Sequence, residues 1–287
     1  MEDKKDKSTN TNINWFPGHM AKAKRQMEEQ LKLVDIIIEL RDARIPFSSE
    51  NPLLKELGKN KKKLIILNKA DLADEIENNK FLLYFDNVLL LDSLHQNINK
   101  IVSEKIKEIC KDILDRAIRR GIKNKTIRAM VVGIPNVGKS TFINSFVKRK
   151  VAKVENRPGV TKNLQWIRID KDIELLDTPG VLWPKFENQE DAIKLAILGT
   201  INDNILDKEE LVNYCLLYLK DNYKDLLIKY YELDNLNNIF EDIGRKKNYL
   251  SEGGQIDKNK TIDSILKDIR LNKIGRISLE KVEDVRE

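Results

Sequence analysis

A nine-residue segment near the middle of the chain constrains the fold more than any other feature. Residues Gly133 to Thr141 satisfy the pattern G-x-x-x-x-G-K-[ST], and they follow an apolar run from Ile127 to Val132. Glycines in this pattern let successive backbone N–H groups turn toward a phosphate, while the Lys139 ammonium and the Ser140 hydroxyl suit phosphate oxygens and Mg²⁺. A chance glycine turn is the alternative, but it leaves the four fixed positions unexplained. The segment therefore predicts a strand, a phosphate loop and a helix.

Length and composition are compatible with two domains in a reducing compartment. The chain has 287 residues, enough for two separate cores. Its 52 Lys and Arg exceed its 46 Asp and Glu, which permits binding to a polyanion but would equally arise from a lysine-rich surface. Cys110 and Cys215 lack metal-ligand spacing, so we interpret them as core thiols. With no segment long enough to span a membrane, we expect a cytoplasmic protein without membrane contact.

Strand and helix patterns alternate through the N-terminal two thirds of the chain, which indicates βαβ units and a mainly parallel sheet. Helices are expected between the strands, including one long helix from Ile98 to Arg120. The last two strands are joined across Lys171 and Asp172, which predicts a hairpin and one antiparallel edge. Ligands of such sheets lie across the carboxyl ends of the strands. The six predicted strands are Val34–Leu40, Leu64–Leu67, Val88–Leu91, Ile127–Val132, Leu164–Ile169 and Ile173–Leu176.

From Glu187 onward the strand patterns stop and helical patterns follow one another. We therefore predict a disordered leader at 1–12, a nucleotide-binding α/β domain at 13–186 and an all-helical domain at 187–287. The helical domain contains two basic groups, Arg245 to Lys247 and the set Arg270, Lys273 and Arg276. These groups suit phosphate contacts on structured RNA, although a solvated surface would have the same composition. The five predicted helices are Ala192–Leu198, Glu209–Leu219, Tyr223–Tyr231, Leu236–Ile243 and Ile262–Leu271.

Two motifs at the ends of the second and third strands indicate that the base is guanine. Asn68, Lys69, Ala70 and Asp71 match N-K-x-D, in which a carboxylate accepts hydrogen bonds from N1–H and the exocyclic amine of guanine. Adenine does not offer this pair of donors. The segment Asp92-Ser93 then occupies the place of a loop that backs the base. The alternatives are a solvated turn for the first motif and an ordinary loop for the second. The phosphate loop in the same chain favours the nucleotide-binding interpretation of both.

Two further segments suit the Mg²⁺ ion and the γ-phosphate. Asp177 begins a D-x-x-G motif that ends at Gly180, so its carboxylate would hold Mg²⁺ through water and the Gly180 N–H would contact the γ-phosphate. Thr161, in the loop before the hairpin, is the candidate that completes the Mg²⁺ shell when GTP is bound. A Pro-Gly turn and an ordinary loop threonine are the alternatives.

The order of these motifs along the chain is rotated. Base recognition comes first, and the phosphate loop, the threonine and D-x-x-G follow it, whereas guanine-nucleotide domains usually begin with the phosphate loop. A circular permutation explains this order, because it moves the termini while keeping the strands and their contacts. The predicted fold class is therefore α/β: a circularly permuted P-loop GTPase domain with a six-stranded, mostly parallel sheet, followed by a C-terminal all-helical domain.

Taken together, the motifs resemble those of the circularly permuted GTPases of the YlqF/RbgA family, ribosome biogenesis GTPase A. The resemblance also includes Trp15 to Met20, Asp42 to Pro46 and Lys273 to Ile277. It implies GTP hydrolysis, with GTP/GDP and Mg²⁺ bound, coupled to late assembly of the large ribosomal subunit. It further implies that the helical domain contacts ribosomal RNA. We expect a monomer when free, and no DNA partner.

The catalytic assignment is less direct, because Val181 follows Gly180 where many GTPases have a glutamine that orients water. The resemblance suggests that His19 substitutes for it, and a histidine that merely packs or caps a helix is the alternative. Asn136 is a candidate K⁺ ligand beside the phosphates, or else a side chain bonded to its own loop. The predicted catalytic residues are His19, Lys139, Thr161 and Gly180. The predicted nucleotide contacts are Asn68, Lys69, Ala70, Asp71, Asp92, Ser93, Asn136, Val137, Gly138, Lys139, Ser140, Thr141 and Gly180.

Two competing functions remain open at this point. The chain is either a GTP-hydrolysing assembly factor, or an RNA-binding or stress-sensing module for which guanine nucleotide is only a regulatory ligand. Val181 keeps the second interpretation open, because a valine cannot position the attacking water.

Overall fold

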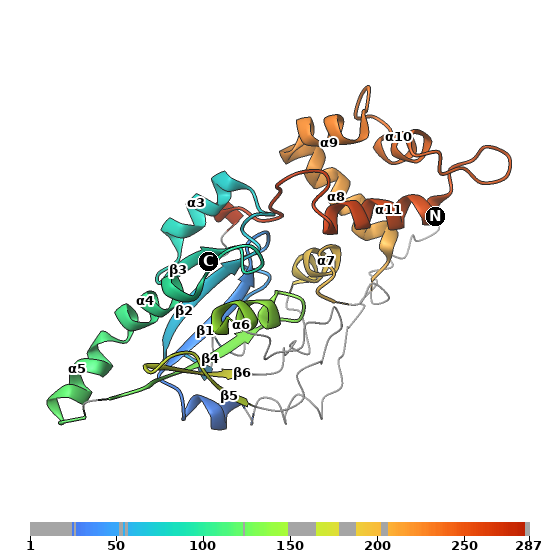
Figure 1. Cartoon of the computed structure of the whole chain (residues 1–287). Helices are drawn as coiled ribbons and strands as arrows, with labels where there is room; N and C mark the ends of the chain where they lie inside the picture. The colour runs from blue at the N-terminus through green and yellow to red at the C-terminus, as the bar shows by residue number, and fades with distance from the viewer. Residues whose placement is uncertain are drawn as a thin grey trace, which may run out of the picture.

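The computed structural model describes residues 25, 27–51, 54, 57–122, 124–148, 165–177, 188–201 and 206–284, and for Gln165 and Asp177 it describes the backbone alone. Within these ranges six strands form one sheet in the order β3-β2-β1-β4-β6-β5 (Figure 1). All neighbours are parallel except the hairpin partners β5 and β6. The predicted parallel sheet with one antiparallel edge is therefore confirmed. The strands are β1 (Ile36–Asp42), β2 (Lys62–Asn68), β3 (Val88–Leu91), β4 (Ile127–Gly133), β5 (Gln165–Arg168) and β6 (Ile173–Asp177).

The central strands are buried on both faces, which explains their continuous apolar sequences. Ile38 of β1 shares a core with Val102 of α4 (Asn99–Ile109) and Phe142 of α6 (Lys139–Val147). Its neighbour Ile37 points to the opposite face and packs with Leu31 of the helical segment before β1. Helices therefore cover both sides of the sheet, and the open carboxyl edge is left for a ligand.

The strand β1 ends two residues later than its apolar run suggested. Arg41 and Asp42 continue the pairing with β2 even though both are charged. The guanidinium of Arg41 is bonded to Glu39 and Glu50, and the Asp42 carboxylate is bonded to Arg44, so each charge is compensated inside the protein. Burial of a charge is tolerated when it is paired in this way.

The predicted long helix from Ile98 to Arg120 is wrong in one respect: it is two helices, α4 and α5 (Lys111–Arg119), interrupted at Cys110. Cys110 has φ −94° and ψ 12°, outside the helical range. Its side chain is buried in the main core, whereas Ala117 is the only buried residue in α5, so the chain leaves the core at this point. The spacing of apolar residues continues across the interruption, which is why the sequence did not reveal it.

Both cysteines are buried, as predicted, and burial raises the pKa of each thiol to about 12. A thiol with so high a pKa is almost entirely protonated near neutral pH, which makes it a poor nucleophile and metal ligand. Cys110 and Cys215 are therefore core residues.

Among the described residues after 187, the helical patterns correspond to five α-helices, which lie beside the carboxyl edge of the sheet (Figure 1). Some begin earlier than predicted because an acidic residue caps them. Asp257, for example, accepts a hydrogen bond from the Lys260 N–H and starts the last helix four residues before Ile262. The helices are α7 (Gln189–Ile197), α8 (Lys208–Asn222), α9 (Lys224–Tyr231), α10 (Ile239–Lys246) and α11 (Lys258–Arg270).

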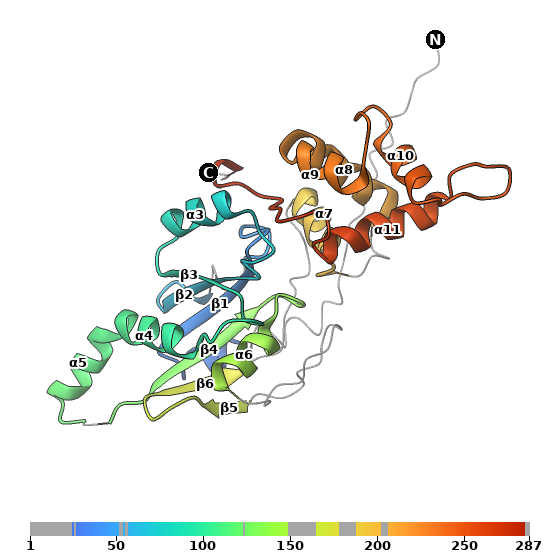
Figure 2. The same cartoon turned by 45° about the horizontal axis from the view of Figure 1, so that its top comes forward.

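The segment 272–284, here called the C-terminal strap, returns from α11 to the sheet and ends near α3 (Glu75–Tyr84), as Figure 2 shows. The Ile277 N–H donates to the Leu72 carbonyl, and the Leu279 N–H donates to the Arg44 carbonyl. The strap therefore belongs to the helical region in sequence but lies against the α/β region in space. The domain boundary predicted at residue 187 stays a prediction.

Within the described ranges, no helix combines the length and the apolar character needed to cross a lipid bilayer. The predicted leader at 1–12 and the segment Trp15 to Met20 lie outside the described residues.

A buried ionic cluster beneath the carboxyl edge generates a stability prediction. Glu39 is fully buried, its carboxylate accepts from the Arg41 guanidinium and from the Asn51 N–H, and it forms an ion pair with the Lys63 ammonium. Burial by itself would raise the pKa of Glu39, but the charges of Arg41 and Lys63 outweigh it and hold the pKa below its ordinary value.

We expect Glu39→Ala to lower the free energy of unfolding by about 3–5 kcal/mol, because Arg41 would lose a buried counter-ion. Denaturant titration of the folded protein measures this change. The matched control is Glu104→Ala, which removes an exposed i,i+4 partner of Lys100 and should change stability by less than about 0.5 kcal/mol. Equal effects of the two substitutions would contradict a structural role for the buried cluster.

Candidate functional site

The loop between β4 and α6 adopts the backbone geometry expected of a phosphate loop. Gly138 has φ +93° and is the N-cap of α6, and Asn136 also has a positive φ, of 59°. No described side chain caps the N-terminus of α6, so the positive end of the helix dipole faces the loop. The Lys139 side chain is buried beside it. This arrangement suits an anion such as a phosphate.

Asn68, at the end of β2, connects the loops that follow β3 and β4. Its Nδ2 donates to the Val137 carbonyl of the phosphate loop at 2.9 Å, and its Oδ1 accepts from the Ser93 N–H at 3.2 Å. A Cβ atom on Gly138 would collide with the same Nδ2, so glycine is required there by both φ and space. The base-recognition motif, the loop after β3 and the phosphate loop are thus joined through one amide.

Lys69 makes a second connection between the base motif and the phosphate loop. Its ammonium donates to the Asn136 carbonyl at 2.8 Å and to Asp42 Oδ2 at 2.9 Å. The Arg44 guanidinium binds both oxygens of the Asp42 carboxylate, at 2.9 and 2.8 Å. Burial by itself would raise the pKa of Asp42, but the charges of Arg44 and Lys69 outweigh it and hold the pKa well below its ordinary value. Asp42 is therefore a permanent anion that orients Lys69.

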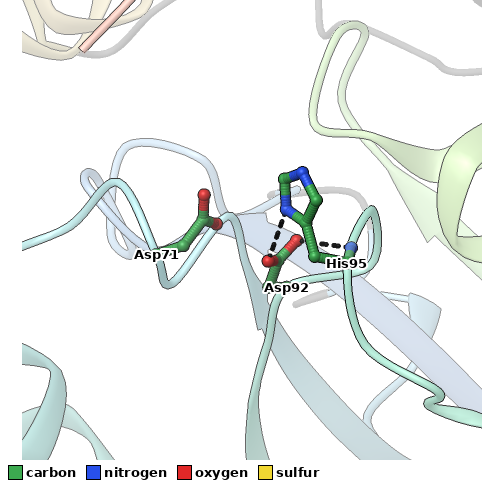
Figure 3. Close-up of side chains that lie close together, drawn as sticks. All are labelled: Asp71, Asp92 and His95. Carbon is green, nitrogen blue, oxygen red and sulfur yellow. Dashed lines mark hydrogen bonds and ion pairs between the residues drawn. The ribbon is translucent and has the colours of Figure 1, made fainter. Parts of the chain in front are cut away.

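Asp71, Asp92 and His95 lie together at the outer end of this region (Figure 3), with potential ligand atoms within 4.8 Å of one another. Asp92 Oδ2 is 2.7 Å from His95 Nδ1, and Asp92 Oδ1 accepts from the N–H groups of Leu94 and His95. These bonds occupy the Asp92 carboxylate, so the group is poorly suited to a metal ion. The exposed Asp71 carboxylate is the member that remains accessible to a base.

The loop after β3 contains a buried polar atom that suits a ligand. The Ser93 side chain is only 4% exposed, and its Oγ has no hydrogen-bond partner among the described residues. Buried hydroxyls are nearly always bonded, so an orphaned one indicates a missing partner. The predicted place of Asp92-Ser93 behind the base is compatible with this geometry.

The phosphate loop also contacts the helical region directly. Asn136 Nδ2 donates to the Gly199 carbonyl at 2.7 Å, just beyond the C-terminus of α7. The Arg270 guanidinium of α11 donates to the carbonyls of Ala196 and Ile197 in the last turn of α7. The contact from Asn136 thus reaches a junction of two helices, which the sequence did not indicate.

Three predicted site residues lie outside the described residues, namely His19, Thr161 and Gly180, and so does Val181. The backbone of Asp177 ends β6, paired with Val131 of β4, while its side chain is not described. Their predicted roles in catalysis and Mg²⁺ binding stay predictions.

Two residues that support the site were not predicted from the sequence. Asp42 binds Lys69, and the Gly199 carbonyl accepts from Asn136. Asp42 could have been found, because it ends a parallel strand, and the carboxyl ends of parallel strands meet at one edge. Gly199 left no comparable signal, since its carbonyl acts through the backbone.

The basic residues near the end of the chain are partly exposed, but they make bonds to other residues of the same chain. Lys273 pairs with Asp268 at 3.1 Å, and Arg276 donates to the carbonyls of Ala73 and Ala70. Together with the Arg270 bonds to α7, these contacts give the three residues a structural role. Their predicted contact with RNA stays a prediction.

Comparison with known proteins identifies the family. A family model described as "50S ribosome-binding GTPase" matches residues 128–246. Ribosome biogenesis GTPase A of Bacillus licheniformis is 44% identical over 282 residues, which cover 95% of this chain and 99% of that protein. The chain belongs to the ribosome biogenesis GTPase A family. A member from Bacillus cereus is 41% identical over 280 residues, covering 95% of each chain. The family predicted from the sequence motifs is therefore confirmed, and with it the GTPase activity.

Solved structures of the family agree with the fold. YlqF from T. maritima bound to GNP has a TM-score of 0.62 and 26% identity, covering 92% of this chain and all of that one. Its GDP-bound form has a TM-score of 0.63 and 25% identity, covering 91% and 100%. The predicted circularly permuted GTPase fold is thus supported by sequence and by structure.

The tight contact between Gly138 and Asn68 generates a prediction for nucleotide binding. We expect Gly138→Ala to weaken GDP binding at least tenfold, about 1.4 kcal/mol, because the added Cβ displaces Asn68 from the phosphate loop. Fluorescence titration with a labelled GDP measures the affinity.

The matched control is Gly253→Ala, since Gly253 has a similar φ of +84° and nothing within 4 Å of an added Cβ. Both variants should lose about 1–2 kcal/mol of stability to left-handed strain, and only Gly138→Ala should lose nucleotide affinity. Normal GDP binding by a folded Gly138→Ala protein would contradict the assignment of the loop.

Proposed function

We propose that this GTPase is an assembly factor for the large ribosomal subunit, which it binds in a nucleotide-dependent way. The observation that carries the proposal is the direct bonding of the base motif to the phosphate loop, from Lys69 Nζ to the Asn136 carbonyl. This bond connects the base motif to the phosphate loop, the two parts of the proposed guanine-nucleotide site. The base motif comes first along the chain. The names of the relatives, which refer to ribosome biogenesis, support the choice of partner.

In the proposed site the base lies against the loops after β2 and β3. The Asp71 carboxylate accepts hydrogen bonds from N1–H and the exocyclic amine of guanine, and the Ser93 hydroxyl supplies the polar wall behind the base. Asp71 is positioned by the preceding residues of the motif, Asn68, Lys69 and Ala70. The exposed position of Asp71 supports this arrangement, as does Ser93 Oγ, which has no hydrogen-bond partner in the part of the chain that the structure describes.

The phosphates lie over the N-terminus of α6, where Lys139 and the backbone of Asn136 to Thr141 surround them. Ser140, Thr161 and Asp177 would hold Mg²⁺, which would supply positive charge beside the phosphate oxygens. Asn136 is proposed to contribute its amide oxygen to K⁺, and its bond to Gly199 fixes the orientation of that amide. Equal rates of hydrolysis in potassium and sodium would contradict the K⁺ site.

His19 is proposed to position the attacking water, because Val181 cannot. We expect His19→Ala to lower the hydrolysis rate by about a hundredfold while leaving GTP affinity unchanged. Single-turnover hydrolysis and equilibrium binding, with and without large subunits, separate the two effects. Normal turnover in this variant would remove His19 from the mechanism.

The proposed partners are a precursor of the large subunit and its ribosomal RNA, and the protein acts as a cytoplasmic monomer when free of them. The net charge of +6 supports association with a polyanion. Such association weakens steeply as salt increases, because bound counter-ions are released from the RNA.

Co-sedimentation with large subunits tests the proposal. We expect retention with a non-hydrolysable GTP analogue, weaker retention with GDP, and multiple-turnover hydrolysis that subunits stimulate. Lys139→Ala should lower hydrolysis by about a hundredfold or more, since it removes the main positive side chain at the phosphates. Nucleotide-independent sedimentation together with the absence of multiple turnover would instead favour a binding module for which guanine nucleotide is a regulatory ligand.

A further inference from the structure

The C-terminal strap is bonded to the backbone of the base-recognition loop. Arg276 Nε donates to the Ala73 carbonyl at 2.8 Å, and its Nη2 donates to the Ala70 carbonyl at 3.2 Å. The neighbouring Ile277 N–H donates to the Leu72 carbonyl at 3.1 Å. Two adjacent residues of the strap therefore bind three backbone carbonyls of this loop, one before Asp71 and two after it.

Two bonds of Ser278 extend this attachment and connect it to the helical region. The Ser278 hydroxyl accepts from the Asp74 N–H at 3.1 Å, at the N-cap of α3. The Ser278 N–H donates to the Tyr223 hydroxyl at 3.0 Å, and Tyr223 lies between α8 and α9. The loop that carries Asp71 is thus connected through Ser278 to the packed helices.

The other side of the strap is held by the loop after β1. Glu280 is 2% exposed, and its carboxylate accepts from the N–H groups of Phe47 and Ser48 at 2.7 and 3.0 Å. The buried Lys194 of α7 lies 3.7 Å from the same carboxylate. These buried charge-assisted bonds give the strap a defined position, so Arg276 is presented to the base loop by a rigid support.

From these contacts we propose that Arg276 is a positioning residue for guanine recognition, through which the helical region controls nucleotide selectivity. Its guanidinium fixes the peptide groups that flank Asp71, and thereby the place of the carboxylate that accepts from the base. Recognition of two donors by one carboxylate depends on position within a fraction of an ångström. The role concerns the base, and it leaves the phosphate loop unaffected.

The proposal rests on the proposed role of Asp71, and inosine diphosphate separates the two. Hypoxanthine has N1–H but lacks the exocyclic amine of guanine, so the ratio of GDP to IDP affinity measures how well a carboxylate meets that amine. Phosphate and ribose contacts are common to both ligands and cancel in the ratio. A loss of stability alone does not change this ratio in protein that remains folded.

The experiment compares four variants of the full chain by equilibrium titration with labelled GDP and IDP. Arg276→Ala removes the guanidinium, and Ser278→Ala removes one bond to the loop with little change in volume. Glu75→Ala is the matched control, because the exposed Glu75 binds Arg276 at 3.2 Å on its outer side without contacting the loop carbonyls. Asp71→Ala removes the carboxylate itself, and with it every side-chain acceptor at this position. Thermal unfolding of each variant confirms that the titrated protein is folded.

We expect Arg276→Ala to lower the GDP to IDP ratio at least about fivefold, because GDP affinity falls more than IDP affinity, and Ser278→Ala to lower the ratio in the same direction. Glu75→Ala should retain the ratio of the unaltered protein. If Asp71→Ala abolishes the preference while Arg276→Ala and Ser278→Ala retain it, the role of Arg276 is overturned and that of Asp71 stands. If Asp71→Ala itself retains the preference, the proposed base contact fails. If Arg276→Ala does not fold, the ratio in Ser278→Ala decides between these outcomes.

Discussion

The nucleotide site depends on the bonds by which Asn68 and Lys69 hold the phosphate loop. Asn68 ends β2 and Lys69 follows it, the phosphate loop follows β4, and β1 lies between these two strands in the sheet. Because both side chains bind backbone carbonyls, their geometry does not depend on the identity of the loop side chains. The Asp42 carboxylate at the end of β1 completes the arrangement by binding Lys69. Three adjacent parallel strands thereby bring the predicted base motif and the phosphate loop to one edge of the sheet.

The rotated order of the motifs has a structural consequence. In this chain β2 and β3 are added successively on one side of β1, and β4 lies on the other side of β1. The carboxyl ends of β1 and β4 therefore form the switch point at which ligands of open α/β sheets bind. The permutation retains this crevice, because strand order in space, and not order along the chain, determines it. It also lets the helical region follow directly after the last strand of the sheet.

The helical region is attached to the site at both ends of the expected nucleotide. The Asn136 amide binds the Gly199 carbonyl near the phosphates, and the strap binds the loop of Asp71 near the base. Both attachments involve residues near the C-terminal end of α11, since Arg270 caps α7 beside Gly199 and Arg276 lies in the strap. A partner that moved the helices would therefore act on phosphate and base contacts together. This is a physical route by which a bound subunit and a bound nucleotide can influence one another.

Much of this protein is determined by local sequence, and the reason is periodicity. Apolar runs with polar ends specified the six strands, and the glycines and polar residues at their ends specified the phosphate loop and the base motif. Contacts between residues far apart in the chain have no such pattern. The interruption at Cys110, the Asp42 to Lys69 ion pair, the Asn136 to Gly199 bond and the return of the strap arise only when the helices pack on the sheet. The sequence thus determined which chemical groups follow the strands at the carboxyl edge of the sheet, and the tertiary structure decided what holds them in place.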